Sequence, residues 1–266
     1  MSAMTNAGKL ARIQSLLAEA HSLSLTLEIG GDPVIPATVS PPPPAANDDA
    51  AFAFADYGKF YDFLRGNKML GPTISGTEFS GCDAIIKACA SANWPISYTA
   101  YALATAYHET AHTMQPIHEL GGTAYLTRMY DINGQRPAKA RELGNLTPGD
   151  GARYAGRGYV QLTGKSNYAK ATTKLRALGI DVDLIANPER AEEPRIAALV
   201  MVWGMLEGWF TTRKLPDDLP ARGPAGKQAF VLSRDIINGT DKQDLIAGYA
   251  VDFQTGLQQG GYKIAA

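Results

Sequence analysis

The chain has 266 residues, of which 45% are hydrophobic and 19% are charged, and its formal net charge is −1. This length and composition are typical of a globular protein with one large domain and an appendage, or with two small domains. The near-zero charge excludes a global basic field for nucleic acid or anionic lipid, so we expect no nucleic-acid partner. No apolar run approaches the roughly 20 residues of a membrane span, which predicts no stable membrane insertion.

The only two cysteines, Cys82 and Cys89, lie seven positions apart. If the segment is helical, they are separated by a rise of about 10 Å, whereas a disulfide needs Cα atoms within about 7 Å. We therefore expect both to be small buried residues, and the count excludes a disulfide framework and a cysteine-based zinc site. The first residues lack the unbroken apolar core of a secretory signal, which favours synthesis in the cytoplasm.

The N-terminal part predicts an amphipathic helix within residues 1–30, because apolar residues recur there at three- and four-residue steps. A Pro-rich linker is expected over 31–54, since the four prolines Pro41 to Pro44 form a stiff extended spacer. One helix cannot bury its own apolar stripe. It therefore self-associates, docks on the main domain or contacts the cell envelope.

A catalytic domain is expected over 55–266, with mainly helical patterns. Ser80 is a candidate cap for one helix, with Asp83 in the capping-box position, and Ser97 is a candidate cap for a mostly apolar helix that reaches residue 113. Helical patterns resume in SNYAKATTKLRALG, which Gly179 closes, and continue to the C-terminal region. The segment from Pro116 to Gly158 is rich in Gly, Asn, Asp and Pro, which predicts a long functional loop with short strands. The predicted fold is therefore mainly α, a helical domain with one long irregular segment at its centre that forms the wall of a cleft.

Two glutamates flank the start of this irregular segment. Glu109 lies near the end of the apolar helix, and burial of a carboxyl group disfavours its charged form, as a general acid at neutral pH requires. Glu119 follows ten residues later and opens a Gly-rich loop. An acid on a buried helix and a base on a polar loop suit glycoside hydrolysis, although this spacing alone is a weak signal.

A second interpretation of the same helix is a zinc site. The letters HETAH match H-E-x-x-H, in which His108 and His112 would share one helix face, and His118 stands where an extended metalloprotease pattern places its third histidine. That pattern has glycine where this chain has Gln115, and the glycine makes the turn that brings the third histidine to the metal. Zinc metalloprotease therefore stays open as an alternative.

The segment GDGARYAGRGYVQLTGKSNYAKA, residues 149–171, has no role in a metalloprotease. Together with His108-Glu109-Thr110, it resembles the fingerprint of the family 19 glycoside hydrolases, which include plant chitinases and many phage endolysins. The resemblance spans about residues 56–260, and the sequence of these motifs is similar to that of the phage endolysin branch. The matching residues are Tyr154, Gly156, Arg157, Gly158, Gln161, Leu162, Thr163, Asn167 and Tyr168.

The resemblance implies a mainly α fold of the α+β lysozyme-like type, with two helical lobes and a central cleft. It also implies roles for individual residues. Glu109 corresponds to the general acid, Glu119 to the general base and Thr163 to the hydroxyl residue that positions the attacking water. It implies an inverting mechanism without a metal or another cofactor. An arginine that many relatives carry near the glutamates is missing around Ile246. Substrate-binding candidates are His108, Gln161, Asn167, Tyr168, Asn238, Tyr154 and Arg157, although Arg157 also suits a structural clamp on a carboxylate and Tyr154 a packing role.

The expected function is that of a peptidoglycan-degrading endolysin, a lysozyme or muramidase that cuts β-1,4 bonds between N-acetylated amino sugars. Its partner would be a peptidoglycan glycan strand, and its site of action the cell wall after the host membrane is disrupted. A chitinase of the same family, acting on chitin oligomers, is the nearest alternative. The zinc metalloprotease and a non-catalytic glycan-binding or virion protein are the others.

Overall fold

The computed structural model describes residues 52–54, 56–70, 73–237 and 239–264, all within the unit Asp48–Ala266. The predicted N-terminal helix and the linker up to residue 51 lie outside the described residues. The predicted mainly α fold is confirmed: helices dominate, and the strands pair only as two short antiparallel ladders. Among the described residues, no helix is long and apolar enough to cross a membrane.

The domain begins earlier than residue 55. Strand β1 (Phe52–Phe54) pairs antiparallel with β4 (Tyr262–Ile264), with Phe52 opposite Ile264. The end of the expected linker is therefore part of the folded unit. This ladder joins the start of the domain to its C-terminal region.

Two of the predicted helix caps are wrong. Ser75 caps α3 (Gly76–Ser91) in a complete capping box with Glu78, and Ser80 lies inside the helix. Helix α4 (Ile96–Glu109) follows Pro95 and ends four residues before the predicted position. The Ser97 hydroxyl donates to the carbonyl of Pro220 instead of capping the helix, because the helix has already begun.

The expected irregular segment contains short helices as well as strands. It contains the predicted short strands β2 (Ile117–His118) and β3 (Arg157–Gly158), which pair with each other. Between them lie three helices that the Gly- and Pro-rich composition hid: α5 (Gly122–Tyr130), α6 (Pro137–Glu142) and α7 (Asp150–Arg153).

Most of the remaining helices follow the predicted patterns, whereas the short helices Pro188–Glu192 and Leu215–Asp218 lie outside them. Helix α8 is closed by Gly179, whose positive φ of 78° suits a residue without a side chain. The bounds are α2 (Tyr57–Gly66), α8 (Lys165–Ala177), η1 (Pro188–Glu192), α9 (Pro194–Glu207), α10 (Leu215–Asp218), α11 (Lys227–Leu232), η2 (Ser233–Ile236) and α12 (Gln243–Gln259).

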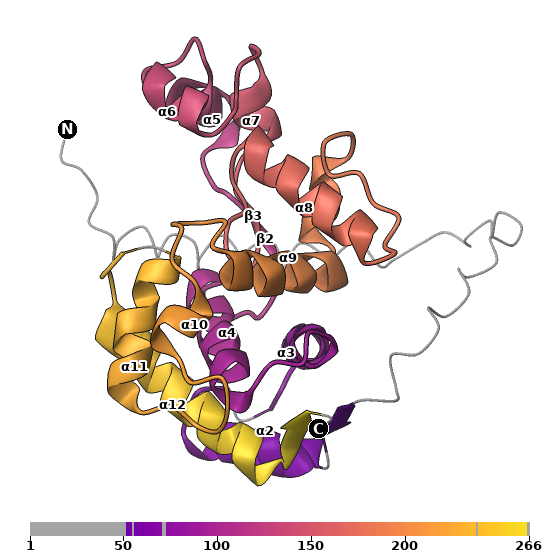
Figure 1. Cartoon of the computed structure of the whole chain (residues 1–266), viewed down its shortest axis with the longest axis vertical. Coiled ribbons are helices and arrows are strands. Elements are labelled where there is room, and N and C mark those ends of the chain that lie inside the picture. The colour runs from indigo at the N-terminus through magenta and orange to yellow at the C-terminus, as the bar shows by residue number, and fades with distance from the viewer. Residues whose placement is uncertain (1–51, 55, 71–72, 238, 265–266) are drawn as a thin grey trace, which may run out of the picture. The chain divides into compact units, whose positions relative to one another are not determined.

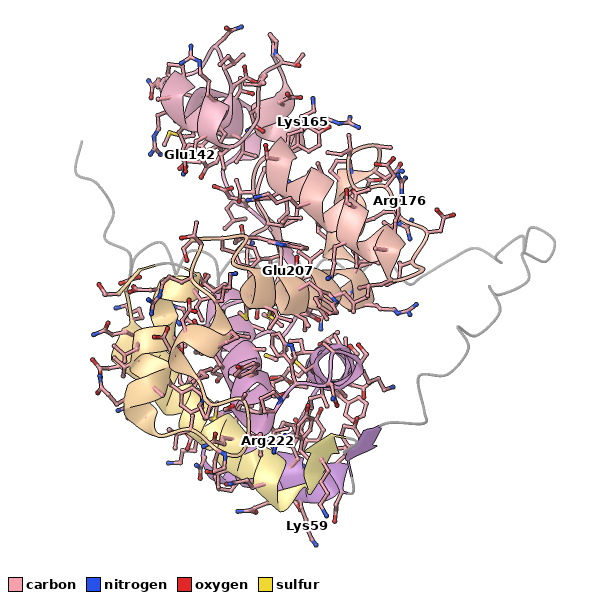
Figure 2. The ribbon with its side chains drawn as sticks, in the orientation of Figure 1. Lys59, Glu142, Lys165, Arg176, Glu207 and Arg222 are labelled. Carbon is pink, nitrogen blue, oxygen red and sulfur yellow. The ribbon has the colours of Figure 1, made fainter. Side chains whose placement is uncertain are left out.

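The helices form two groups within the described unit, as Figure 1 shows. Helices α5, α6, α7 and α8 lie at one end, and α2, α3, α4, α10, α11 and α12 lie at the other, with α9 and the β2–β3 ladder between them. Helix α4 packs chiefly against α12, and α3 against α9. Charged side chains such as Lys59, Glu142 and Arg222 lie on the outer surface (Figure 2).

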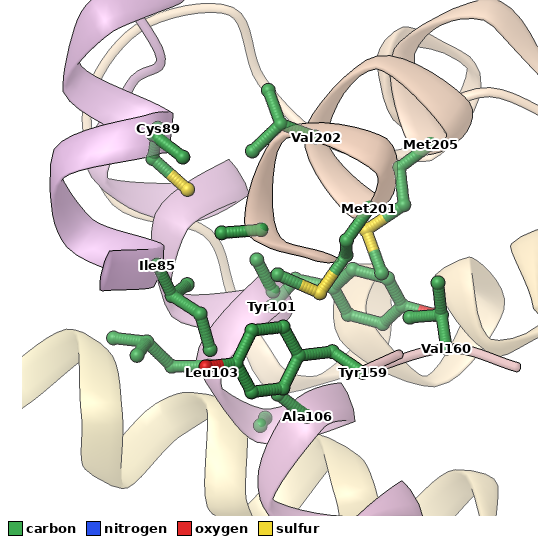
Figure 3. Packing of buried hydrophobic residues seen from close by; sticks show 14 of the residues in the cluster. Ile85, Cys89, Tyr101, Leu103, Ala106, Tyr159, Val160, Met201, Val202 and Met205 are labelled. Carbon is green, nitrogen blue, oxygen red and sulfur yellow. The ribbon is translucent and has the colours of Figure 1, made fainter. Parts of the chain in front are cut away.

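A continuous apolar core fixes the position of the β2–β3 ladder. Tyr159 directly follows β3 and is fully buried, and Figure 3 shows it among side chains such as Ile85 of α3, Leu103 of α4 and Met201 of α9. Cys82 and Cys89 are buried free thiols in this core, as predicted. Because this ring lies in the core, it anchors the end of β3 to the packed helices.

Candidate active site

Glu109 is the last residue of α4, a helix whose residues Ser97 to Tyr107 are all buried. Its side chain is 19% exposed, and Oε1 lies 2.9 Å from Nη2 of Arg234, whose side chain is 1% exposed. Arg234 belongs to η2 and donates from Nε to the carbonyl of Asp241 at 2.8 Å. The cation expected around Ile246 is therefore supplied from a different position, upstream of Asn238.

The Glu109–Arg234 pair is incomplete as a hydrogen-bonded unit. The contact is short, but its direction is not that of a hydrogen bond, and within the described part of the chain neither Oε1 of Glu109 nor Nη1 of Arg234 has a hydrogen-bond partner. Unsatisfied buried polar atoms of this kind are uncommon in folded proteins and are often found at functional sites.

His108 neighbours this pair and is half-buried. Burial lowers the pKa of His108, Arg234 and Lys242 add to the lowering, and Glu109 and Asp241 oppose it. The imidazole is therefore neutral at neutral pH. A neutral imidazole has one donor and one acceptor nitrogen, which suits recognition of uncharged hydroxyl and amide groups.

The chain leaves α4 through a strained turn. Ala111 N–H donates to His108 O and His112 N–H to Tyr107 O, which is a Schellman motif with alanine where glycine is usual. Ala111, His112 and Met114 all have positive φ, of 51°, 72° and 54°. Each such residue costs about 1 kcal/mol or more, so the turn keeps a conformation that its sequence does not favour.

This turn removes the basis of the zinc interpretation. The helix ends at Glu109, so His108 and His112 do not share a helical face, and the His112 ring stacks on Tyr107 with 4.1 Å between centroids and an interplanar angle of 8°. Over the described ranges, no group of three or more His, Cys, Asp or Glu side chains is arranged to hold a metal ion. The H-E-x-x-H letters therefore do not form the geometry of that motif.

Glu119 directly follows β2 and is half-buried. Its N–H donates to Gly156 O at 2.7 Å, which continues the β2–β3 ladder. Its carboxylate accepts from the Tyr130 hydroxyl at 2.8 Å and from Gly156 N–H at 3.1 Å. Burial, followed by the hydrogen bond to Glu119, raises the pKa of Tyr130, so this hydroxyl stays protonated and donates.

Gly156 brings three predicted residues together. A methyl group on its Cα would lie 2.6 Å from Gln161 Oε1, 3.0 Å from Glu119 Oε2 and 3.1 Å from Thr163 Oγ1. Because both atoms are so close to one point, the Glu119 carboxylate and the Thr163 hydroxyl are at most about 6 Å apart. The Thr163 hydroxyl donates to Gln161 O at 2.8 Å. The lone pairs of its oxygen are therefore available to accept a hydrogen bond from water.

Asn167 extends this polar wall from the first turn of α8, where its amide donates to Thr163 O at 3.0 Å. An open groove of about 760 Å³ begins at the neighbouring Ser166 and runs between α8 and the end of α9. Its lining extends to Trp209 and includes none of the predicted site residues that the structure describes.

Three predicted substrate contacts need correction. Tyr154 is 3% exposed, Tyr168 is 0% exposed and Arg157 is 8% exposed, so their side chains lie beneath the surface. Arg157 donates to Glu192 at 3.0 Å and to the Tyr168 hydroxyl at 2.9 Å, which confirms the structural-clamp alternative. Asn238 lies outside the described residues.

Comparisons with known proteins were made at three levels. No family model matches the chain. No curated protein matches it either. Among solved structures it is similar to a bacterial family 19 chitinase, with 18% identity, a TM-score of 0.43 and coverage of 80% of this chain and 98% of that one. Chitinase C from Streptomyces griseus HUT6037 is similar at 20% identity and a TM-score of 0.39, covering 80% of this chain and 73% of that one.

A mutant of chitinase C gives the same identity and a TM-score of 0.38, over 80% of this chain and 88% of that one. At these identities and TM-scores, the similarities carry no argument about catalysis or substrate. The functional argument therefore rests on the geometry of this chain's own residues.

Proposed function

We propose that the protein is a glycoside hydrolase that inverts the anomeric centre, with Glu109 as general acid and Glu119 as general base. The observation that carries the proposal is the convergence of Glu119, Thr163 and Gln161 around Gly156. That arrangement provides a carboxylate base and a hydroxyl acceptor near one small volume. In an inverting glycosidase, the base needs a water molecule in such a position.

The proposed steps use these groups in order. Protonated Glu109 gives its proton to the leaving glycosidic oxygen. Ionised Glu119 takes a proton from the water that Thr163 orients, and this water attacks the anomeric carbon from the opposite face. The mechanism requires the two carboxyl groups to be roughly 6.5–9.5 Å apart, which leaves room for the water.

The surrounding contacts suit these assignments. Tyr130 and Gly156 N–H donate to Glu119 and hold its carboxylate in one orientation, as a positioned base requires. Glu109 lies at a buried helix end beside Arg234, where removal of water strengthens every electrostatic interaction. Gln161 and Asn167 supply amide groups for the hydroxyl and acetamido groups of a sugar.

We propose peptidoglycan as the substrate and host-cell lysis as the role, with action in the cell wall after the membrane is breached. The endolysin-like sequence of residues 108–119 and 149–163 supports this proposal, as does the absence of a disulfide framework. Chitin shares the β-1,4-linked N-acetylated amino sugars and is the alternative substrate of the same site.

The deciding experiment is mass analysis of the fragments released from purified peptidoglycan and from chitin oligomers, side by side, with and without a chelator. We expect new reducing ends on muramic acid from peptidoglycan, faster than any cleavage of chitin and unaffected by the chelator. Cleavage of chitin alone would indicate the chitinase. Chelator-sensitive cleavage of peptide bonds would indicate a protease, and binding without cleavage a glycan-binding module.

A further inference from the structure

His112 is an exposed aromatic ring three residues beyond the proposed acid. At about 3.8 Å per residue, its Cα lies within about 11 Å of that of Glu109. His108 is also near His112: after burial, the charge of His108 is the next cause that lowers the pKa of His112. A ring at this distance suits contact with a sugar two units from the bond to be cut.

The His112 ring is part of a three-ring assembly. It stacks on Tyr107 with 4.1 Å between centroids, and Tyr249 of α12 stands perpendicular to both rings, 5.0 Å from Tyr107 and 5.8 Å from His112. Tyr107 is 4% exposed and donates its hydroxyl to the carbonyl of Met69. One face of His112 is therefore covered by a fixed ring and one edge by another, which leaves its outer face exposed to solvent.

The Schellman motif explains only part of this arrangement. The motif places an apolar contact between the residues corresponding to His112 and Tyr107, and it requires a positive φ at Ala111. It does not require a positive φ at His112 and Met114, nor an exposed imidazole rather than an aliphatic side chain. Backbone strain that the local motif does not need is a feature of ligand-binding segments.

The turn is also held in place from outside. A methyl group on Gly81 of α3 would lie 1.8 Å from Met114 O, so the turn packs directly on that helix. The Gln115 side-chain amide donates to Met114 O at 2.9 Å and also to the Thr77 carbonyl. Because the turn is fixed against α3, the ring is pre-organised, and binding to it would cost little conformational entropy.

We propose that the outer face of His112 is a stacking platform for a pyranose ring of the bound glycan, at a subsite next to the two that flank the bond that is cut. The C–H groups on one face of a pyranose are attracted to the electron-rich face of an aromatic ring. The platform is a binding residue rather than a catalytic one. This inference rests on the proposed function of the Glu109 site.

The test measures the binding of chitin oligosaccharides, a disaccharide and a hexasaccharide, by calorimetric titration in the full-length Glu109→Gln background, where no hydrolysis occurs. We expect His112→Ala to weaken hexasaccharide binding about three- to ten-fold and to leave disaccharide binding unchanged. His112→Phe, which keeps the stacked ring, should retain the parental affinities. The matched control is Phe79→Ala, which removes a ring that is 43% exposed and packs on Tyr57 and Tyr61 of a different helix.

The outcomes separate the two proposals. If the Glu109→Gln parent binds neither oligosaccharide and the wild type cleaves neither glycan, the proposed function is wrong. If the parent binds and His112→Ala has no effect, or weakens both oligosaccharides equally, the platform alone is wrong. Failure of His112→Phe to retain hexasaccharide affinity would likewise contradict a stacking role.

Discussion

Glu109 ends a buried helix and contacts a single charged group, whereas Glu119 follows a two-residue strand and accepts from a hydroxyl and a backbone N–H. The first carboxyl group has an unsatisfied oxygen beside a buried guanidinium, and the second is held by well-directed donors. The contrast teaches that the site distinguishes its two carboxyl groups by their donors. A carboxylate stabilised by hydrogen bonds suits a base, and a carboxyl group on a desolvated helix end suits an acid.

Replacement of the acid should give the largest effect. We expect Glu109→Gln to lower kcat on the glycan about 10²- to 10⁴-fold, because a positioned general acid contributes on that order. Gln keeps the size of the side chain and a polar oxygen beside the buried guanidinium of Arg234, so the melting temperature should stay close to that of the wild type. Glu109→Leu places an apolar side chain beside this guanidinium and should cost about 3 kcal/mol of stability in chemical denaturation. Equal stability of the two variants would contradict the proposed contact.

A methyl group at Gly156 disturbs the base side alone. Gly156→Ala should lower kcat about 10- to 100-fold, because Gln161, Glu119 and Thr163 must all move from the added carbon. Gly248→Ala on α12 is the matched control, since nothing lies within 4 Å of its added methyl. It should leave kcat unchanged and add up to about 1 kcal/mol of stability. A similar kcat for both variants would separate Gly156 from the reaction.

The Thr163 hydroxyl tests whether the base side holds a water. Thr163→Val keeps the shape but removes the acceptor, and we expect kcat to fall about ten-fold, which corresponds to one hydrogen bond of about 1.4 kcal/mol. Thr163→Ser keeps the hydroxyl and should retain most of the activity. Steady-state rates of the two variants on the same glycan decide the matter, and a serine variant as slow as the valine one argues against the water-holding role.

The smallest expected effect is on the free energy of unfolding between neutral and mildly acidic pH. Because burial lowers the pKa of His108, the unfolded chain binds a proton more readily than the folded one. The contribution of this histidine to the free energy of unfolding is fully present above the pKa of about 6.5 that it has in the unfolded chain. It is lost as the pH falls from there towards the lower folded pKa. Chemical denaturation between neutral and mildly acidic pH should show a shallower decline in the free energy of unfolding for His108→Gln than for the wild type. A steeper decline for His108→Gln would contradict a lowered pKa of His108.

The sequence predicted which residues lie around Glu119, but it predicted the surroundings of Glu109 incompletely. Glu119, Gln161, Thr163 and Asn167 lie within short segments whose order alone links them, and the β2–β3 ladder brings the segments together. Arg234 was missed because its contact with Glu109 joins residues far apart in the chain. A lone arginine in the apolar run AFVLSRDII was a usable signal, since a buried cation requires a partner.

The direction of side chains also could not be predicted from the sequence. Tyr154 and Tyr168 match the motif, but a motif does not tell which side of the wall an aromatic ring occupies, and both rings lie in the core. The end of α4 was placed too late because the residue that terminates it is Ala111, and alanine ordinarily favours helix. Helices α5 to α7 were hidden for the opposite reason, since they are short and lie among glycines and prolines.

The assignment of acid and base is tested most directly by the leaving group. Glu109→Gln and Glu119→Gln are compared on the natural glycan and on an oligosaccharide with a dinitrophenolate leaving group, which departs without protonation. We predict that Glu109→Gln recovers most of its lost rate on the activated substrate, whereas Glu119→Gln stays impaired on both. Recovery by Glu119→Gln instead, or by neither variant, would contradict the account.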